Sequence, residues 1–196
     1  EQDITRNFLT LDLSLQGVAE ALALPGINNT TSQVRQAALF DRAATAENLG
    51  VITVTDAQGN LVEKSTPGLA PRNYADREYF KAHQQRSDLG LFISRPFRSR
   101  ISGKWTVAVS RRLLTPDGNF GGVVVGAVYL ELFSSMFEKL DLGPNGSVTL
   151  FRDDGRIIAR NPLTESDIDR DLGAAKSFQD CNRLGAGHFV NKAAID

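Results

Sequence analysis

The hydrophobic residues near the start of the chain recur at the spacing of an α-helix. Apolar side chains stand three or four positions apart and would form one stripe along a helix; they are Ile4, Phe8, Leu11, Leu15, Val18 and Leu22. Pro25 and Gly26 end this pattern. The stripe allows two interpretations. The helix packs on its own domain, or it continues from a membrane segment and pairs with a partner subunit.

The pattern after this helix predicts a mixture of helices and strands. An alanine-rich helix is expected from Ser32, as its N-cap, to Leu49. Alternating and β-branched runs predict strands at 51–55, 61–62, 90–94, 106–113 and 122–130, and a helix at 131–140. The segment 141–146 is rich in turn residues and marks a boundary.

The first hairpin pattern recurs beyond this boundary. Gly59 and Gly155 each lie in an acidic turn between two short apolar strands. This repeat predicts a second module of the same type. The sequence becomes polar and glycine-rich after Pro162, so we expect too few strands to close the second sheet, and an incomplete second module.

Composition and charge exclude several classes of protein. Of the 196 residues, 41% are hydrophobic and 23% are charged, and the net charge is −1, which excludes a disordered chain and a general nucleic-acid binder. The longest run free of charged or strongly polar side chains, Phe120 to Leu130, is about half of the ~20 residues that span a bilayer. The chain starts with Glu1 rather than Met, so we interpret it as a piece of a longer protein. Cys181 cannot form an internal disulfide, and we assign it no role.

No catalytic or metal-binding pattern stands out. His83 and His188 lie far apart and lack the spacing of a zinc site or a nucleophile motif. The glycine-rich segment 118–122 lies between strands, without the following helix that holds a phosphate. The acidic residues at 167–171 resemble a calcium loop, but Leu172 replaces the glycine that such a loop requires. We therefore expect no catalytic residue, no metal and no cofactor.

An arginine among aromatic residues is the most informative feature. Arg77 lies close to Tyr74, Tyr79 and Phe80. An arginine fork binds a carboxylate through two hydrogen bonds, and aromatic walls strengthen those bonds by excluding water. The alternative is structural: Asp76 caps a short helix, and Arg77 forms an internal salt bridge.

Several motifs in order give the chain a family resemblance. The segments are Asp76–Phe80, Ile93–Pro96, Gly103–Trp105, Ser110–Arg112, Asp117–Val124, Leu130–Phe133, Leu140–Gly143 and Asp154–Pro162. The chain resembles the double Cache (PDC, tandem PAS-like) sensor domain, especially those of bacterial diguanylate cyclases and hybrid histidine kinases. The resemblance implies an α+β fold, in which a long N-terminal helix precedes two PAS-like modules with antiparallel sheets, the second truncated. The implied organisation is a helical segment over 1–48, a membrane-distal ligand-binding module over 49–141 and a membrane-proximal module over 142–196.

The resemblance also implies a set of ligand contacts. Arg77 and Tyr79 match the positions that commonly hold a ligand carboxylate in this family. The candidate contacts are Tyr74, Asp76, Arg77, Tyr79, Ser94, Arg95, Trp105 and Tyr129. Amino-acid-binding members place an aspartate near the end of the last distal strand, where this chain has Ala127. A ligand ammonium would lack its counter-charge, so we expect a small carboxylate or other anion rather than an amino acid.

The expected function is therefore sensing. The resemblance implies the periplasmic part of an inner-membrane protein, a diguanylate cyclase, which relays ligand binding through the N-terminal helix of a homodimer. A histidine kinase or chemoreceptor parent is the alternative. A dimerising spacer that binds nothing, with Arg77 in an internal salt bridge, and an enzyme or soluble carrier with a PAS-like core are the rivals.

Overall fold

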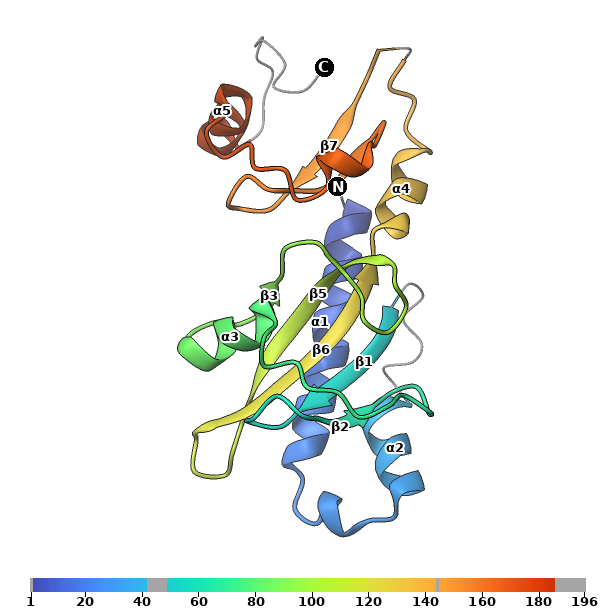
Figure 1. Ribbon diagram of the computed structural model, residues 1–196, viewed down its shortest axis with the longest axis vertical. Coiled ribbons are helices and arrows are strands. Elements are labelled where there is room, and N and C mark those ends of the chain that lie inside the picture. Colours follow the sequence, from blue (N-terminus) through green and yellow to red (C-terminus); the bar gives the residue numbers. More distant parts are fainter. Residues whose placement is uncertain (1, 42–48, 144, 186–196) are drawn as a thin grey trace. The chain divides into compact units, whose positions relative to one another are not determined.

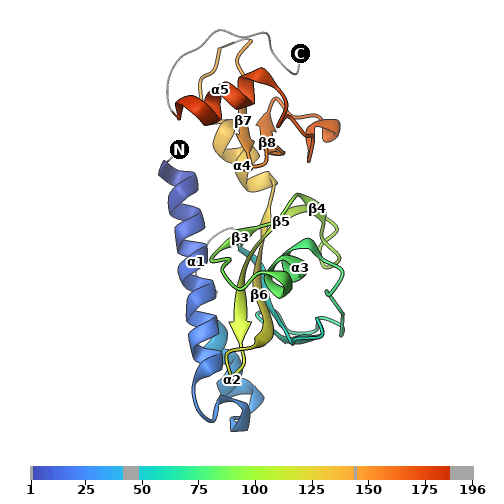
Figure 2. The ribbon, with the colours of Figure 1, turned by 90° about the vertical axis from the view of Figure 1, so that its left-hand side faces the viewer.

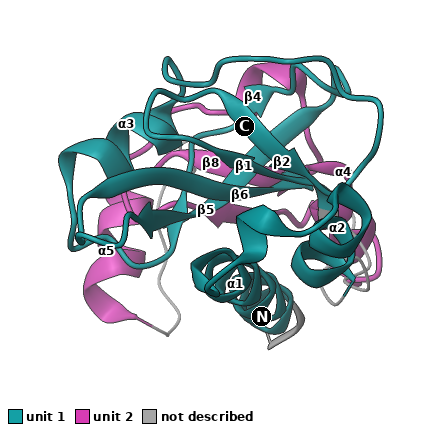
Figure 3. Ribbon diagram, turned by 90° about the horizontal axis from the view of Figure 1, so that it is seen from below, with its two compact units in different colours: residues 1–129 teal, residues 130–196 magenta. Residues whose placement is uncertain are grey.

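The computed structural model describes residues 2–41, 49–143 and 145–185 (Figure 1). The chain divides into two compact units, residues 1–129 and residues 130–196 (Figure 3). The module boundaries expected from the sequence stay a prediction. The observed helices and antiparallel sheets confirm the α+β fold class.

The N-terminal helix α1, Gln2–Ala23, packs on the sheet of its own unit. Leu11, Leu15 and Val18 of the predicted stripe are buried, which confirms the first interpretation of that stripe. The homodimer expected through this helix stays a prediction. Because these three side chains are already buried within their own unit, a partner would have to contact another face of α1. Leu9 and Leu13 lie on such an exposed face. Among the described helices, none combines the length and apolar character needed to cross a membrane.

A short 3-10 turn, η1 (Ile27–Asn29), leads to the second helix, α2 (Ser32–Phe40). The hydroxyl of Thr31 accepts a hydrogen bond from the Val34 amide at 3.4 Å, so the expectation of Ser32 as the N-cap was wrong by one residue. The expected helix end at Leu49 was also wrong, since that residue starts a strand. Residues 42–48 lie outside the described part of the chain.

The first unit is built on one antiparallel sheet. Its strands are β1 (Leu49–Thr55), β2 (Leu61–Lys64), β3 (Phe92–Ile93), β4 (Phe97–Arg98), β5 (Trp105–Leu114) and β6 (Phe120–Tyr129). Their order is β2-β1-β6-β5-β3, and β4 pairs with the start of β5. The longer strands follow the sequence prediction, whereas β4 was not predicted.

Helices cover both faces of this sheet, as Figure 2 shows: α1 lies on one face and α3, Glu78–Gln85, on the other. The face under α3 carries a cluster of aromatic and aliphatic side chains that includes Tyr74, Tyr79, Phe80 and Val125. This cluster fixes the segment before α3 against the sheet.

The second unit repeats part of this arrangement. Its elements are α4 (Glu131–Phe137), β7 (Val148–Phe151), β8 (Ile157–Asn161), η3 (Glu165–Asp167) and α5 (Lys176–Leu184). The hairpin of β7 and β8 confirms the predicted strands. Helix α5 was not predicted, and its Phe178 ring packs on Phe151 with ring centres 5.5 Å apart.

Candidate functional site

A pocket opens on the α3 face of the first unit's sheet. The space between its walls amounts to about 400 Å³, open solvent at its mouth included. Its lining residues come from β1, the segment before α3, α3 itself, β4 with the turn after it, and the central strands; they are Val51, Thr53, Tyr74, Arg77, Tyr79, Phe97, Ser99, Arg100, Ile101, Thr106, Ala108, Val125 and Ala127.

The floor of the pocket is made of small and apolar side chains. Thr53 of β1 pairs with Val125 of β6, and Ala108 of β5 pairs with Ala127. Paired residues of neighbouring strands share a face of the sheet, so these four lie side by side under the pocket. A floor of this kind suits the hydrocarbon part of a small molecule.

The segment that carries Tyr74 and Arg77 is held against the β1–β2 hairpin. The Tyr74 amide donates to the Gly59 carbonyl at 2.8 Å. Gly59 has a φ of 84°, and a Cβ at this position would lie 2.6 Å from the Ala75 nitrogen. Glycine is therefore needed both for the turn and for the close approach of the binding segment. Sequence reasoning identified Gly59 as a turn residue and missed this second role.

Arg77 presents an unpaired cation to the pocket. Its guanidinium lies over the Phe97 ring, 4.7 Å from the centroid, and its Nε is buried without a hydrogen-bond partner. Within the described part of the chain, Arg77 forms no ion pair. The alternative interpretation, in which Arg77 forms an internal salt bridge and Asp76 caps the helix, is therefore wrong on both points. The N-cap position of α3 is occupied by Arg77 itself rather than by Asp76.

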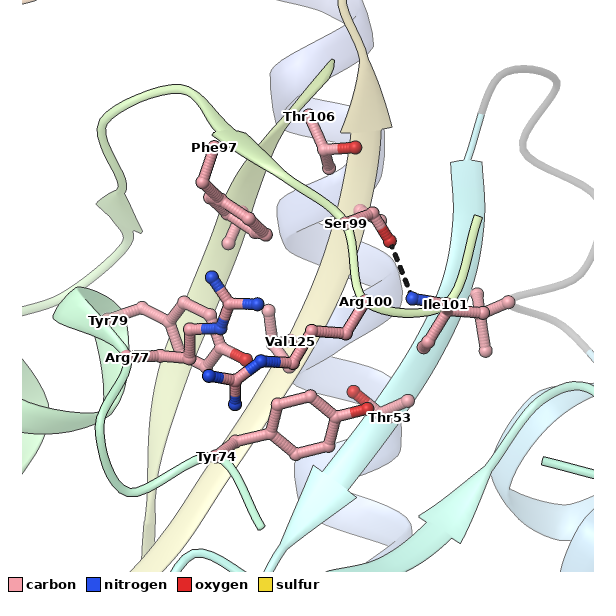
Figure 4. A pocket seen from close by; sticks show the side chains of 13 residues that line it. Thr53, Tyr74, Arg77, Tyr79, Phe97, Ser99, Arg100, Ile101, Thr106 and Val125 are labelled. Carbon is pink, nitrogen blue, oxygen red and sulfur yellow. Dashed lines mark hydrogen bonds between the residues drawn. The ribbon is translucent and has the colours of Figure 1, made fainter. Parts of the chain in front are cut away.

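Two tyrosines add neutral hydroxyl groups. Burial raises the pKa of Tyr79 and, to a smaller extent, that of Tyr74, so both phenols keep their protons at neutral pH. The Tyr74 Oη is buried and has no hydrogen-bond partner. Figure 4 shows the two rings beside the Arg77 side chain. A buried donor without a partner costs about 1–3 kcal/mol, so this arrangement favours an acceptor from outside the chain.

A second arginine reaches the pocket from the turn after β4. Arg100 donates to both carboxylate oxygens of Asp76, at 2.6 and 3.0 Å, and to the Asn73 carbonyl at 3.3 Å. The Arg100 guanidinium holds the pKa of Asp76 below its usual value. Asp76 is thus occupied by Arg100, and none of the described residues that line the pocket is acidic.

The other predicted contacts do not line this pocket. The Ser94 hydroxyl accepts from the Ala108 amide and donates to the Arg95 carbonyl, so it joins β3 to β5. Arg95 is exposed, and its amide donates to Glu78. The Trp105 ring stacks on Arg98, and the Tyr129 ring lies under Lys104. Their contact with a ligand stays a prediction that the pocket does not support.

Four of the lining residues that sequence reasoning missed come from β4 and the turn that follows it, and the others come from the strands β1, β5 and β6. Phe97, Ser99 and Ile101 belong to this stretch, as does Arg100, which stood out only as one of several basic residues. Among the described residues, no three His, Cys, Asp or Glu side chains come together as a metal site.

The second unit repeats the hairpin but not the arginine and tyrosine of the pocket. In the first unit Asn73, before α3, forms an isolated β-bridge with Asn60, and in the second unit Asp171, before α5, forms one with Arg156. These two equivalent bridges align the two segments. By this alignment, Leu172 stands in place of Tyr74, and Ala175 in place of Arg77. The pocket with its cation is therefore a feature of the first unit.

Comparison with known proteins places this fold in a family. The Cache domain family model (dCache_1) matches residues 1–192. No curated protein sequence matches the chain. The extracellular domain assigned to a histidine kinase, rpHK1S-Z16, is 34% identical, with a TM-score of 0.76 over 90% of this chain and 71% of that one.

More distant structures share the fold. The ligand-binding domain of the Pseudomonas fluorescens chemoreceptor CtaA, in complex with L-leucine, is 16% identical, with a TM-score of 0.63 over 90% of this chain and 69% of that one. The Campylobacter jejuni chemoreceptor Tlp3 domain, in complex with 4-methylisoleucine, is 14% identical, with a TM-score of 0.57 over 82% and 63%. Because the family model spans nearly the whole sequence, the chain belongs to the Cache domain family of extracellular sensor domains.

Proposed function

We propose that this chain is the extracellular ligand-binding domain of a signalling receptor, and that its pocket binds a small monocarboxylate. The observation that carries the proposal is the pair of buried, unpartnered donors at the pocket, Arg77 Nε and Tyr74 Oη. An anion supplies the acceptors that both groups lack, and charge-assisted bonds of this kind are the stronger class.

The described lining residues include no acidic side chain, which argues against an amino acid as the ligand. The related CtaA and Tlp3 domains bind amino acids, whose ammonium group needs a counter-charge. Ala127 lines this pocket at the position where the family resemblance implies an aspartate in amino-acid-binding members, and Asp76 is engaged by Arg100. A carboxylate with a short apolar or hydroxylated tail fits these groups better.

The parent receptor is proposed to be a histidine kinase. The 34% identical relative is assigned to that class, whereas no comparison supports the diguanylate cyclase expected from the sequence. Autophosphorylation of the full-length receptor on a histidine tests this assignment.

Strand β5 offers a route from the pocket to α1. Thr106 and Ala108 line the pocket, while Arg111 on the opposite face forms an ion pair with Asp12 of α1. We propose that a ligand favouring one position of β5 shifts α1 through this contact.

Matched ligands test the binding proposal. Propanoate, L-lactate and L-alanine share a three-carbon skeleton and a carboxylate, but only alanine carries an ammonium group. Calorimetric titration should show tighter binding of propanoate or lactate than of alanine. Arg77→Met should weaken that binding by about 10- to 100-fold, from the ~1.5–3 kcal/mol of a hydrogen bond to a charged group.

The control variant is Arg86→Met, at the exposed end of α3, outside the pocket lining. It should bind like the wild type. Tighter binding of alanine would overturn the carboxylate proposal. If no carboxylate binds, and Arg77→Met leaves the melting temperature unchanged, the spacer interpretation replaces it.

A further inference from the structure

Two arginines are among the described residues that line the pocket, and of these two Arg77 is the one available to a ligand. Arg77 has an unpaired, buried Nε, whereas Arg100 donates two hydrogen bonds to Asp76, at 2.6 and 3.0 Å. The Arg100–Asp76 pair is the two-bond fork in which guanidinium and carboxylate match best. The chain therefore supplies its own carboxylate to the second arginine.

We infer that Asp76 determines specificity by limiting the pocket to ligands with a single negative charge. This inference rests on the proposed function, and it gives Asp76 a role different from that of a ligand contact. A dicarboxylate whose first group bound Arg77 would bring its second group toward Arg100, where the Asp76 carboxylate already sits. The second group would have to break the fork and would face a like charge.

The position of the Arg100–Asp76 pair lets Asp76 compete directly with the second carboxylate of a ligand. Arg100 belongs to the turn after β4 and Asp76 to the segment before α3, and Arg100 also donates to the Asn73 carbonyl at 3.3 Å. Figure 4 shows the guanidinium groups of Arg77 and Arg100 in the same space, beside Tyr74 and Tyr79. A molecule held at Arg77 thus extends toward a cation that is already neutralised.

The exposure of the pair sets the expected size of the effect. The side chains of Arg100 and Asp76 are 41% and 56% exposed, so their attraction is screened by water. Exposed pairs contribute up to about 1 kcal/mol, which corresponds to about fivefold in affinity. Removing Asp76 should therefore improve dicarboxylate binding several-fold without abolishing the site.

The test uses ligand pairs that differ only at the far end. Each pair joins a monocarboxylate to the dicarboxylate of equal chain length: propanoate with malonate, butanoate with succinate, and pentanoate with glutarate. Calorimetric titration gives the affinity ratio within each pair for the wild type and for Asp76→Asn. The amide keeps the shape of the side chain but cannot neutralise Arg100.

We expect the wild type to prefer the monocarboxylate, and Asp76→Asn to shift the ratio about fivefold toward the dicarboxylate. The double variant Asp76→Asn with Arg100→Met should lose this shift, since the gain depends on the released guanidinium. Asp76→Ser serves as a second single variant if the asparagine protein folds poorly.

The two proposals fail in different ways. If monocarboxylates bind the wild type but the ratio is unchanged in both Asp76 variants, the role of Asp76 is overturned and the proposed function stands. A wild type that binds monocarboxylates but binds the matched dicarboxylates more tightly also overturns the inference, while carboxylate binding by the pocket stands. If no carboxylate binds the wild type or any variant, the proposed function fails and the inference falls with it.

Discussion

Loss of stability at mildly acidic pH should come from one buried histidine. The side chain of His83 is 0% exposed, and its Nε2 lies 3.0 Å from the Ser110 hydroxyl, while its Nδ1 has no partner. The nearby charged groups are the guanidiniums of Arg111 and Arg112. Burial, with a smaller effect of these cations, lowers the pKa of His83, so the folded protein holds it neutral.

The sign and size of the effect follow from proton linkage. The unfolded chain binds a proton at His83 with a pKa near ~6.5, and the folded chain binds it only at lower pH. Stability is therefore highest above that pH and is lost as the pH falls below it. The largest loss that this one group can cause between pH 7.5 and 5.5 is about 1.4 kcal/mol, reached when the folded state stays unprotonated throughout.

Urea unfolding at both pH values measures this loss. The wild type should lose up to about 1.4 kcal/mol of unfolding free energy on acidification, and His83→Gln should lose clearly less, although it starts from a lower stability. His188 is present in both proteins, so its contribution cancels in the difference. An equal loss in the two proteins would refute the assignment to His83.

Three further predictions concern stability. Leu15→Ala should lower the unfolding free energy by about 2–5 kcal/mol because the side chain is fully buried, whereas Leu13→Ala, at a position 67% exposed, should change little in the same denaturation assay. Asp12→Asn should cost about 1–2 kcal/mol at pH 7 through loss of the ion pair with Arg111. The pKa of Asp12 is lowered mainly by the hydrogen bond from Arg111, so this difference should shrink as the pH falls below about 4, where the unfolded chain takes up a proton at Asp12 that the folded wild type binds only at lower pH. Gly59→Ala should lower the melting temperature and weaken carboxylate binding, because the added Cβ displaces the segment that carries the site.

The sequence predicted the elements whose apolar residues recur at a helical spacing or form a long β-branched run. Helix α1 presents one apolar stripe, and strands β5 and β6 carry continuous apolar runs that are buried on both faces of the sheet, so these patterns were sufficient. The two-residue strand β4 depends on its pairing with β5, which no local pattern records. Helix α5 has no fully buried side chain, and its nine residues hold only two large apolar side chains, Phe178 and Leu184, so its segment resembled a polar loop.

The candidate site was predictable only where its residues are close in sequence. Tyr74, Arg77 and Tyr79 form one local motif, and the structure places all three at the pocket. Arg100 and Ile101 come from a distant turn, and the paired strands bring them to the same space. Trp105 was grouped with the site as a nearby aromatic, but the neighbouring Thr106 lines the pocket, and alternate strand residues face opposite sides.

The internal repeat distinguishes the backbone geometry, which both units share, from the side chains at the pocket, which differ between them. Gly59 and Gly155 have φ values of 84° and 83°, and each brings the following segment against its hairpin. The backbone frame that holds Arg77 in the first unit is thus also built in the second, where Ala175 takes the same place. Since one frame occurs with and without the cation, the fold alone cannot account for carboxylate binding. We therefore attribute the proposed carboxylate binding to Arg77 and its neighbours, and Arg77→Met, rather than disruption of the hairpin, is the substitution that tests it.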